Sequence, residues 1–317
     1  MSLSQDDKRF NMSKKIRIGT RESHLAIWQA ERVKSLLRQQ GVEAELVYIK
    51  SEGDLDLITP LYAMGVQGIF TRSLDQALLN NHIDLAVHSM KDVPVRLPTG
   101  LTEAAVLERD SPFDLLVPHP SNNKIILDDH QPVTIASSSL RRKAQWIHRF
   151  PADHIEPIRG NINTRLKKLE AGNWWGAIFA AAGLERIGLR PANAVELDWM
   201  IPAPAQGAIL VVCREREEDL FELCQKLNHE PTAFCVKTER DFLAALLGGC
   251  STPIGALAEM TGEEIFFRGN LLDTSGEKMF SIEKRISTEL AASLGTAAAH
   301  ELLSSGGNEI MEQKQHA

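Results

Sequence analysis

One cysteine occupies a position where a thiol is presented on a turn. Cys250 follows a Gly-Gly pair and precedes Pro253, between a helical pattern and a strand pattern. Glycine permits turn conformations that other residues avoid, and proline cannot continue a helix, so we expect this thiol on a turn. Most free cysteines are buried and inert, so the position alone leaves a structural and a chemical role open.

Arginines gather where predicted strands end, and this pattern suggests an anion site. Arg21 follows the strand 14–20, Arg141 and Arg142 follow 133–137, Arg159 and Arg165 follow 154–158, and Arg186 follows 175–180. Ligands bind at the carboxyl ends of strands in open α/β sheets. A single arginine at a turn can be an ordinary surface residue, but six of them predict a pocket for carboxylates or phosphates. The chain has neither of the usual Gly-rich nucleotide fingerprints, which disfavours a nucleotide as the anion.

A second group of reactive side chains follows the predicted strand 83–87. Ser89, Lys91 and Asp92 bring a hydroxyl, an ammonium and a carboxylate within four residues of one another. Asp92 alone could be a turn former, but the three side chains together at a strand end favour a functional site.

The elements that must position these residues form two similar units. The strand 14–20, a helix that Ser23 caps and Gly41 ends, and the strand 43–49 make a β-α-β unit with a parallel sheet. A helix over 70–80 and the strand 83–87 follow the long connection 51–68. The second unit has strands near 114–117, 133–137, 154–158 and 175–180, with helices between them. Crossings near 105–111 and 201–208 predict two α/β lobes that enclose a cleft.

The last part of the chain predicts a small α+β domain with Cys250 at its front edge. Its expected elements are a helix over 230–247, strands near 254–259, 264–272 and 279–286, and a final helix over 288–304. The apolar strand 208–213 and a helix near 220–227 suit a return to the first lobe. The predicted domains are therefore 14–107 with 208–228, then 110–204, then 230–317.

Composition excludes several classes of protein. With 317 residues, 43% hydrophobic and 24% charged, the chain is typical of a globular protein of two or three domains. A net charge of −7 argues against a general surface for nucleic acid or anionic membranes. No apolar run is long enough to span a membrane, and residues 1–13 read as a polar tail. The four cysteines lack C-x-x-C spacing, which disfavours a metal site and makes a reducing cytoplasm the simplest location.

Seven blocks of the sequence resemble, in the right order, those of the porphobilinogen deaminase (hydroxymethylbilane synthase) family. They are Arg17–Ser23, Ala86–Pro94, Ser138–Arg142, Ile158–Asn161, Ala182–Leu184, Pro204–Gly207 and Gly248–Cys250. The resemblance implies an α/β fold of two periplasmic-binding-protein-like lobes with mostly parallel sheets and a small C-terminal α+β domain.

The resemblance also implies an activity. The enzyme would be a cytoplasmic, monomeric transferase of tetrapyrrole (haem) biosynthesis that joins four porphobilinogen molecules head to tail. Ammonia would be lost at each step, and the product would be released as hydroxymethylbilane. A dipyrromethane cofactor would be attached through a thioether to Cys250.

The family's functional residues match positions in this chain. Asp92 would be catalytic, stabilising the positive charge that forms on the substrate when ammonia leaves. The residues matched to cofactor binding are Ser89, Lys91, Ser139, Arg141, Arg142 and Arg165. Those matched to incoming substrate are Arg21, Ser23, Arg159 and Arg186. The family usually has lysines in the 51–68 connection where this chain has Ala63 and Gln67, so a basic lid is not expected here.

Two other functions fit parts of the pattern. A non-catalytic two-lobe protein could use an arginine-lined cleft to bind a small polycarboxylate, but it would not need a third domain with a presented thiol. A cysteine hydrolase would need a histidine partner for Cys250, and the sequence places none beside it.

Overall fold

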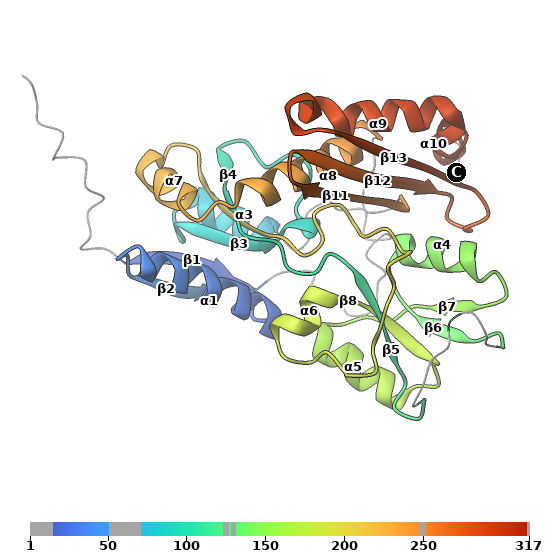
Figure 1. Ribbon diagram of the computed structural model, residues 1–317. Helices are drawn as coiled ribbons and strands as arrows, with labels where there is room; N and C mark the ends of the chain where they lie inside the picture. Colours follow the sequence, from blue (N-terminus) through green and yellow to red (C-terminus); the bar gives the residue numbers. More distant parts are fainter. Residues whose placement is uncertain (1–14, 51–70, 123–126, 128–130, 247–251, 316–317) are drawn as a thin grey trace, which may run out of the picture.

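The computed structural model describes residues 15–50, 71–122, 127, 131–246 and 252–315. The described chain forms two mixed α/β lobes and a third domain with an antiparallel sheet (Figure 1). Cys250, the connection 51–68 and the polar tail 1–13 lie outside the described residues. No helix in the described ranges has the length and apolar character needed to cross a membrane.

The first lobe is built on a five-stranded sheet with the order β2-β1-β3-β10-β4. Its strands are β1 (Ile16–Thr20), β2 (Ala44–Tyr48), β3 (Leu85–Ser89), β4 (Leu101–Val106) and β10 (Ile209–Arg214), and its helices are α1 (His24–Gln39), α3 (Arg72–Leu79) and α7 (Glu218–Gln225). β1 pairs in parallel with β2 and β3, whereas β10 is antiparallel to both of its neighbours. The prediction that the apolar strand 208–213 returns to this lobe is confirmed, and β4 is a strand that the sequence analysis missed.

The second lobe repeats this arrangement with the strand order β7-β6-β8-β5-β9. Its strands are β5 (Asp114–Pro118), β6 (Thr134–Ala136), β7 (His154–Glu156), β8 (Gly176–Ala180) and β9 (Val195–Glu196), and its helices are α4 (Leu140–Arg149), α5 (Ile162–Ala171) and α6 (Ala181–Arg186). β5 runs antiparallel to β8 and β9, while β6 pairs in parallel with β7 and β8. In each lobe the reversed strand is the one that follows a crossing from the other lobe. The expected α/β class with mostly parallel sheets in the two lobes is confirmed. The sheet of each lobe contains one reversed strand.

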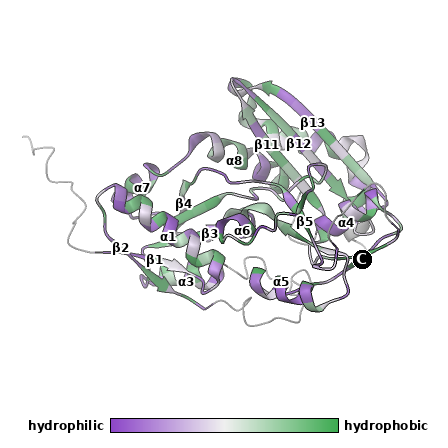
Figure 2. Ribbon diagram, turned by 60° about the horizontal axis from the view of Figure 1, so that its bottom comes forward, coloured by the Kyte–Doolittle hydropathy of each residue, from purple (hydrophilic) through white to green (hydrophobic). Residues whose placement is uncertain are grey.

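The C-terminal domain packs helices against one three-stranded sheet. It contains α8 (Glu230–Ala245), β11 (Ile254–Thr261), β12 (Glu264–Leu272), β13 (Met279–Ser287), α9 (Leu294–Leu302) and α10 (Asn308–Gln315). Phe242 of α8 and Phe267 of β12 are fully buried with ring centroids 5.1 Å apart. Hydrophobic residues run along β3 and β4, whereas helices such as α5 and α7 alternate between hydrophilic and hydrophobic residues (Figure 2).

The predicted single helix over 288–304 is wrong. Residues Thr288–Ser293 form a 3-10 turn, α9 follows, and a wider turn over Leu303–Gly307 separates α9 from α10. Gly306 has φ 117°, which favours glycine, and a Cβ there would lie 2.5 Å from the ring of Phe280. The α-helix therefore begins six residues after the predicted start, and Gly306 lies in the turn that separates α9 from α10.

A buried glutamate joins the C-terminal domain to both crossings between the lobes. The carboxylate of Glu239 on α8 is fully buried and accepts a bond of 2.6 Å from Nη1 of Arg109. It also accepts bonds from the backbone N–H groups of Ala205 and Ala258. Arg109 and Ala205 lie on the two crossings between the lobes, and Ala258 lies on β11. The Glu239 side chain therefore fixes the C-terminal domain to both crossings.

A second buried carboxylate, in lobe 1, is incompletely paired. Asp75 on α3 is 6% exposed, and its Oδ1 has no hydrogen-bond partner among the described residues. Burial raises the pKa of Asp75 to about 6, although a bond with Thr71 opposes the shift. When the pKa of a carboxyl group is higher in the folded than in the unfolded state, the group lowers the free energy of unfolding at pH values above the folded-state pKa. Below the unfolded-state pKa the group is protonated in both states, and the loss disappears.

We therefore expect Asp75→Asn to raise the free energy of unfolding by about 2 kcal/mol at pH 8. The gain should be much smaller at pH 4.5, where the wild-type carboxyl is largely protonated in the folded state. Urea unfolding at the two pH values measures the difference, with the exposed Asp198→Asn as a matched control. An equal gain at both pH values would contradict this explanation.

Candidate active site

The end of β3 carries the first group of predicted site residues. β3 ends at Ser89, and the chain continues as a 3-10 turn over Met90–Asp92. The side chain of Met90 is buried and anchors this turn, while Asp92 is exposed. The predicted placement of Ser89, Lys91 and Asp92 at a strand end is therefore confirmed.

The turn between β1 and α1 faces the same region. Ser23 is the N-cap of α1, and its hydroxyl accepts a bond from the N–H of Ala26, as the sequence analysis predicted. A small cavity separates this turn from the end of β3. The polar side chains in its wall are Arg21, Ser23, Gln29, Thr71, His88, Ser89 and Asp92. The first lobe thus brings together residues that were predicted from two separate blocks.

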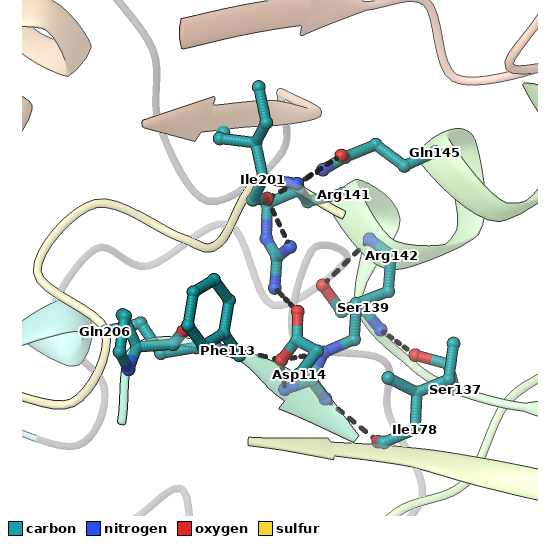
Figure 3. Close-up of polar contacts among 12 residues, drawn as sticks. Phe113, Asp114, Ser137, Ser139, Arg141, Arg142, Gln145, Ile178, Ile201 and Gln206 are labelled. Atoms are coloured by element: carbon teal, nitrogen blue, oxygen red, sulfur yellow. Dashed lines mark hydrogen bonds and ion pairs between the residues drawn. The ribbon is translucent and has the colours of Figure 1, made fainter. Parts of the chain in front are cut away.

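In the second lobe, the predicted arginines of α4 share a buried carboxylate. Asp114, the first residue of β5, is fully buried and accepts a bond of 2.7 Å from Nη2 of Arg141. Its other oxygen accepts bonds from Nε and Nη2 of Arg142, the latter at 2.7 Å (Figure 3). Both arginines lie in the first turn of α4, where Ser139 is the N-cap and accepts from the N–H of Arg142. The helix dipole disfavours cations at a helix N-terminus. The carboxylate of Asp114 therefore supplies part of the negative charge that these two arginines require.

A glutamine links this cluster to the first lobe. Nε2 of Gln206 donates to Oδ1 of Asp114 at 2.9 Å and to the carbonyl of Pro112. Oε1 of Gln206 accepts a bond of 3.2 Å from Nζ of Lys91. The residues Lys91, Gln206 and Asp114 therefore form a continuous chain of hydrogen bonds from the end of β3 to α4.

The charges in this region affect one another. Burial alone would raise the pKa of Asp114, but the two guanidinium groups hold it well below its usual range. Burial and the charge of Arg142 lower the pKa of Lys91 to about 8. Burial and Arg142 likewise lower the pKa of Arg165 to about 9, so both cations remain mainly protonated at neutral pH.

The other predicted arginines lie at different distances from this cluster. Arg165 on α5 donates to the carbonyl of Ile178, the same acceptor that Arg142 uses, and its guanidinium lies 4.5 Å from the ring centroid of Phe179. Arg159 is half-buried just before α5. These contacts place Arg165 in the Asp114 cluster.

Arg186 has a different environment from the one its sequence position suggested. It lies in the last turn of α6 and not directly at a strand end. Its Nε bonds Asp110 at 2.7 Å and its Nη2 donates to the carbonyl of Gly207. Both partners belong to the crossings between the lobes, so in this conformation Arg186 connects the two crossings.

The Asp114 cluster is suited to a ligand with several carboxylates. Lys91, Arg141, Arg142 and Arg165 supply four positive charges around one buried carboxylate. The Nε atoms of Arg141 and Arg165 are buried and have no hydrogen-bond partner among the described residues. Unpaired buried donors are rare, so the residues present fit an anionic group such as a dipyrromethane, whose pyrrole rings carry acetate and propionate.

Sequence reasoning missed three polar residues of the site. Asp114 was predicted only as the start of a strand, although an acid beside apolar residues was a signal of a buried ion pair. Gln206 was quoted only as part of a block, and His88 was noted without a role. Their roles depend on partners that are distant in sequence, such as Arg141 and Arg142 for Asp114, and local patterns do not specify these contacts.

Comparisons with known proteins agree with this architecture. The model of the family described as porphobilinogen deaminase, dipyromethane cofactor binding domain, matches residues 16–222. The model of the porphobilinogen deaminase C-terminal domain matches residues 233–304.

Several solved structures of low sequence identity are also similar. The periplasmic VFT2 domain of BvgS from Bordetella pertussis has a TM-score of 0.41 at 12% identity, covering 67% of this chain and 86% of that one. The probable amino-acid ABC transporter extracellular-binding protein YtmK from Bacillus subtilis has a TM-score of 0.41 at 13% identity, covering 68% and 90%. A putative periplasmic sulfonate-binding protein from Methylobacillus flagellatus has a TM-score of 0.38 at 13% identity, covering 73% and 69%.

The two family matches cover all three domains, and the cofactor-binding match spans more than half of the chain. The chain therefore belongs to the porphobilinogen deaminase family, the transferases of tetrapyrrole biosynthesis that carry a dipyrromethane cofactor.

Proposed function

We propose that this chain condenses four porphobilinogen molecules head to tail and releases the product as hydroxymethylbilane. The observation that carries the proposal is the surplus of positive charge around Asp114, directly beside the exposed carboxylate of Asp92. Porphobilinogen carries an acetate and a propionate, so the growing chain gains negative charge at each step. Several charge-assisted hydrogen bonds, each worth about 1.5–3 kcal/mol, can hold such a chain without deep apolar burial.

The binding residues divide between the two lobes. Arg21 and Ser23 lie in the cavity beside Asp92 and are suited to the carboxylates of the incoming substrate. Arg159 and Arg186 are proposed to join them, Arg186 after exchanging its partner Asp110 for a substrate carboxylate. The proposed cofactor carboxylate ligands are Ser89, Lys91, Ser139, Arg141, Arg142 and Arg165.

Asp92 is the proposed catalytic residue. Departure of ammonia breaks the C–N bond of the substrate's aminomethyl group and leaves a positive charge that the pyrrole nitrogen shares. A carboxylate at this position can accept the pyrrole N–H bond and stabilise that charge as it forms. When bound, a dipyrromethane would supply the free α-carbon to which the new methylene is joined, and the proton lost from that carbon would be taken up by the departing ammonia. The surrounding cations orient the carboxylates, while Asp92 compensates the developing charge.

The proposal also includes three domains, which are 14–107 with 208–228, then 110–204, and then 230–317. The protein is proposed to be a monomer in the cytoplasm. The unpaired thiols of Cys213, Cys224 and Cys235 support a reducing environment. The C-terminal domain would carry the cofactor tether at Cys250.

Intact mass spectrometry tests the proposal most directly. The purified protein is expected to be heavier than its sequence by a two-pyrrole adduct, and Cys250→Ala is expected to lack this additional mass. Cys235→Ala, in the same domain, serves as the matched control and should keep the adduct. An unmodified wild-type mass, together with no colour in an aldehyde test for pyrroles, would overturn the proposed function.

A further inference from the structure

One histidine in the lobe 1 cavity is neither paired nor explained by the proposed roles. His88 is the residue before Ser89 on β3 and is 6% exposed. Its Nε2 is buried and has no hydrogen-bond partner among the described residues. Leaving a buried polar group unsatisfied costs about 1–3 kcal/mol, and in native proteins such a group commonly marks a ligand or another function.

The neighbours of His88 do not satisfy it. Ser89 and Gln29 bond to each other, with Nε2 of Gln29 donating to the serine hydroxyl at 2.8 Å. The charged groups that share the cavity with His88 are Arg21 and Asp92. The imidazole therefore lines the same cavity as a cation that is suited to a substrate carboxylate and the carboxylate proposed for catalysis.

The environment of His88 keeps its ring uncharged. Burial, assisted by the charge of Arg21, lowers the pKa of His88 to about 4. At neutral pH the ring thus has one N–H donor and one acceptor nitrogen. This state suits the proposed chemistry, because an imidazolium here would oppose the positive charge that forms on the substrate. A neutral N–H can still donate to a carboxylate.

We infer that His88 is a substrate-binding residue that donates a hydrogen bond from its neutral imidazole to the porphobilinogen carboxylate held by Arg21. The ring lines the cavity, and the inferred contact requires a rotation about the Cβ–Cγ bond that turns a nitrogen toward the bound molecule. The inference rests on the proposed function and adds to it a second, uncharged contact for the same carboxylate. His88 fixes the orientation of the incoming pyrrole and takes no part in proton transfer.

Steady-state kinetics separate this role from a structural one. His88→Leu keeps an apolar side chain of similar size, and it is expected to raise the KM for porphobilinogen about tenfold with kcat within about twofold of wild type. His88→Gln restores an uncharged N–H donor and should bring KM back to within about threefold of wild type. The exposed His82→Leu is the control and should leave both constants unchanged.

A spectroscopic measurement observes the contact itself. Protein with ¹⁵N-labelled histidine, in an Asp92→Asn background that slows turnover, should give a neutral-ring signal for His88 at pH 7. The signal is assigned by its absence from the His88→Gln spectrum, and it should shift when porphobilinogen is added. This experiment decides the question if His88→Leu does not fold.

The failures of the two proposals are distinguishable. Wild-type protein that neither carries the adduct nor consumes porphobilinogen contradicts the proposed function. An active wild type whose KM is unchanged by His88→Leu, or whose His88 signal does not move with substrate, overturns the role of His88 alone.

Discussion

Replacing Asp92 with asparagine is expected to lower kcat for porphobilinogen consumption by about 10²–10³-fold, the usual cost of removing a group that stabilises transition-state charge. Asparagine has the same shape but no negative charge, so it can still accept a hydrogen bond from a pyrrole N–H. The positive charge that forms when ammonia leaves would then face Lys91 and the arginines without compensation. The loss should therefore appear in kcat more than in KM.

The same variant should keep its cofactor. Asp92 is exposed on the 3-10 turn and forms no part of the hydrogen-bond chain from Lys91 to Asp114. The two-pyrrole mass is therefore expected to be present in Asp92→Asn, as measured on the intact protein. Asp219→Asn, an exposed change of the same charge on α7 in the same lobe, should leave kcat unchanged. Turnover of Asp92→Asn at the wild-type rate would refute the catalytic role.

Much of the fold could be predicted because local patterns and caps agree with it. The apolar runs of β8 and β10 and the N-cap residues Ser23 and Ser139 define elements without reference to distant contacts. β4 was missed because Leu101–Val106 contains polar residues and two alanines, which are weak strand formers. Its position follows from pairing with β10, more than a hundred residues away in sequence.

Most residues of the candidate site could be predicted from the sequence, but the hydrogen bonds and ion pairs among them could not. The cations at the start of α4 predicted a pocket for the carboxylates or phosphates of a ligand. Asp114, 27 residues before Arg141, supplies one carboxylate inside the protein, and this partner was not predicted. The guanidinium groups of Arg141 and Arg142 join β5 to α4, and we propose that they also bind the anionic cofactor. Sequence spacing could not reveal this, because the pairing depends on how β5 enters the sheet.

Asp114 is the residue whose loss should most affect the stability of the second lobe. Asp114→Asn leaves Arg141 and Arg142, both 6% exposed, without their counter-charge, and breaking a buried ion pair costs about 3–5 kcal/mol. The variant is expected to lower the free energy of unfolding by that amount in urea. Cofactor retention should fall as well, since asparagine keeps only one of the two acceptor oxygens that Gln206 and both arginines share.

The pH dependence tests the cause of this loss. The pKa of Asp114 is held well below the usual value of 3.8, so its stabilising contribution is complete above about pH 4 and declines as the pH falls further. The difference between wild type and Asp114→Asn should therefore be largest near neutral pH and shrink below pH 4. Asp110→Asn is the matched control, because Asp110 also pairs with an arginine of this lobe but is 45% exposed, and its removal should cost only about 1 kcal/mol. Equal losses for the two variants would mean that burial of the Asp114 pair is not what stabilises the lobe.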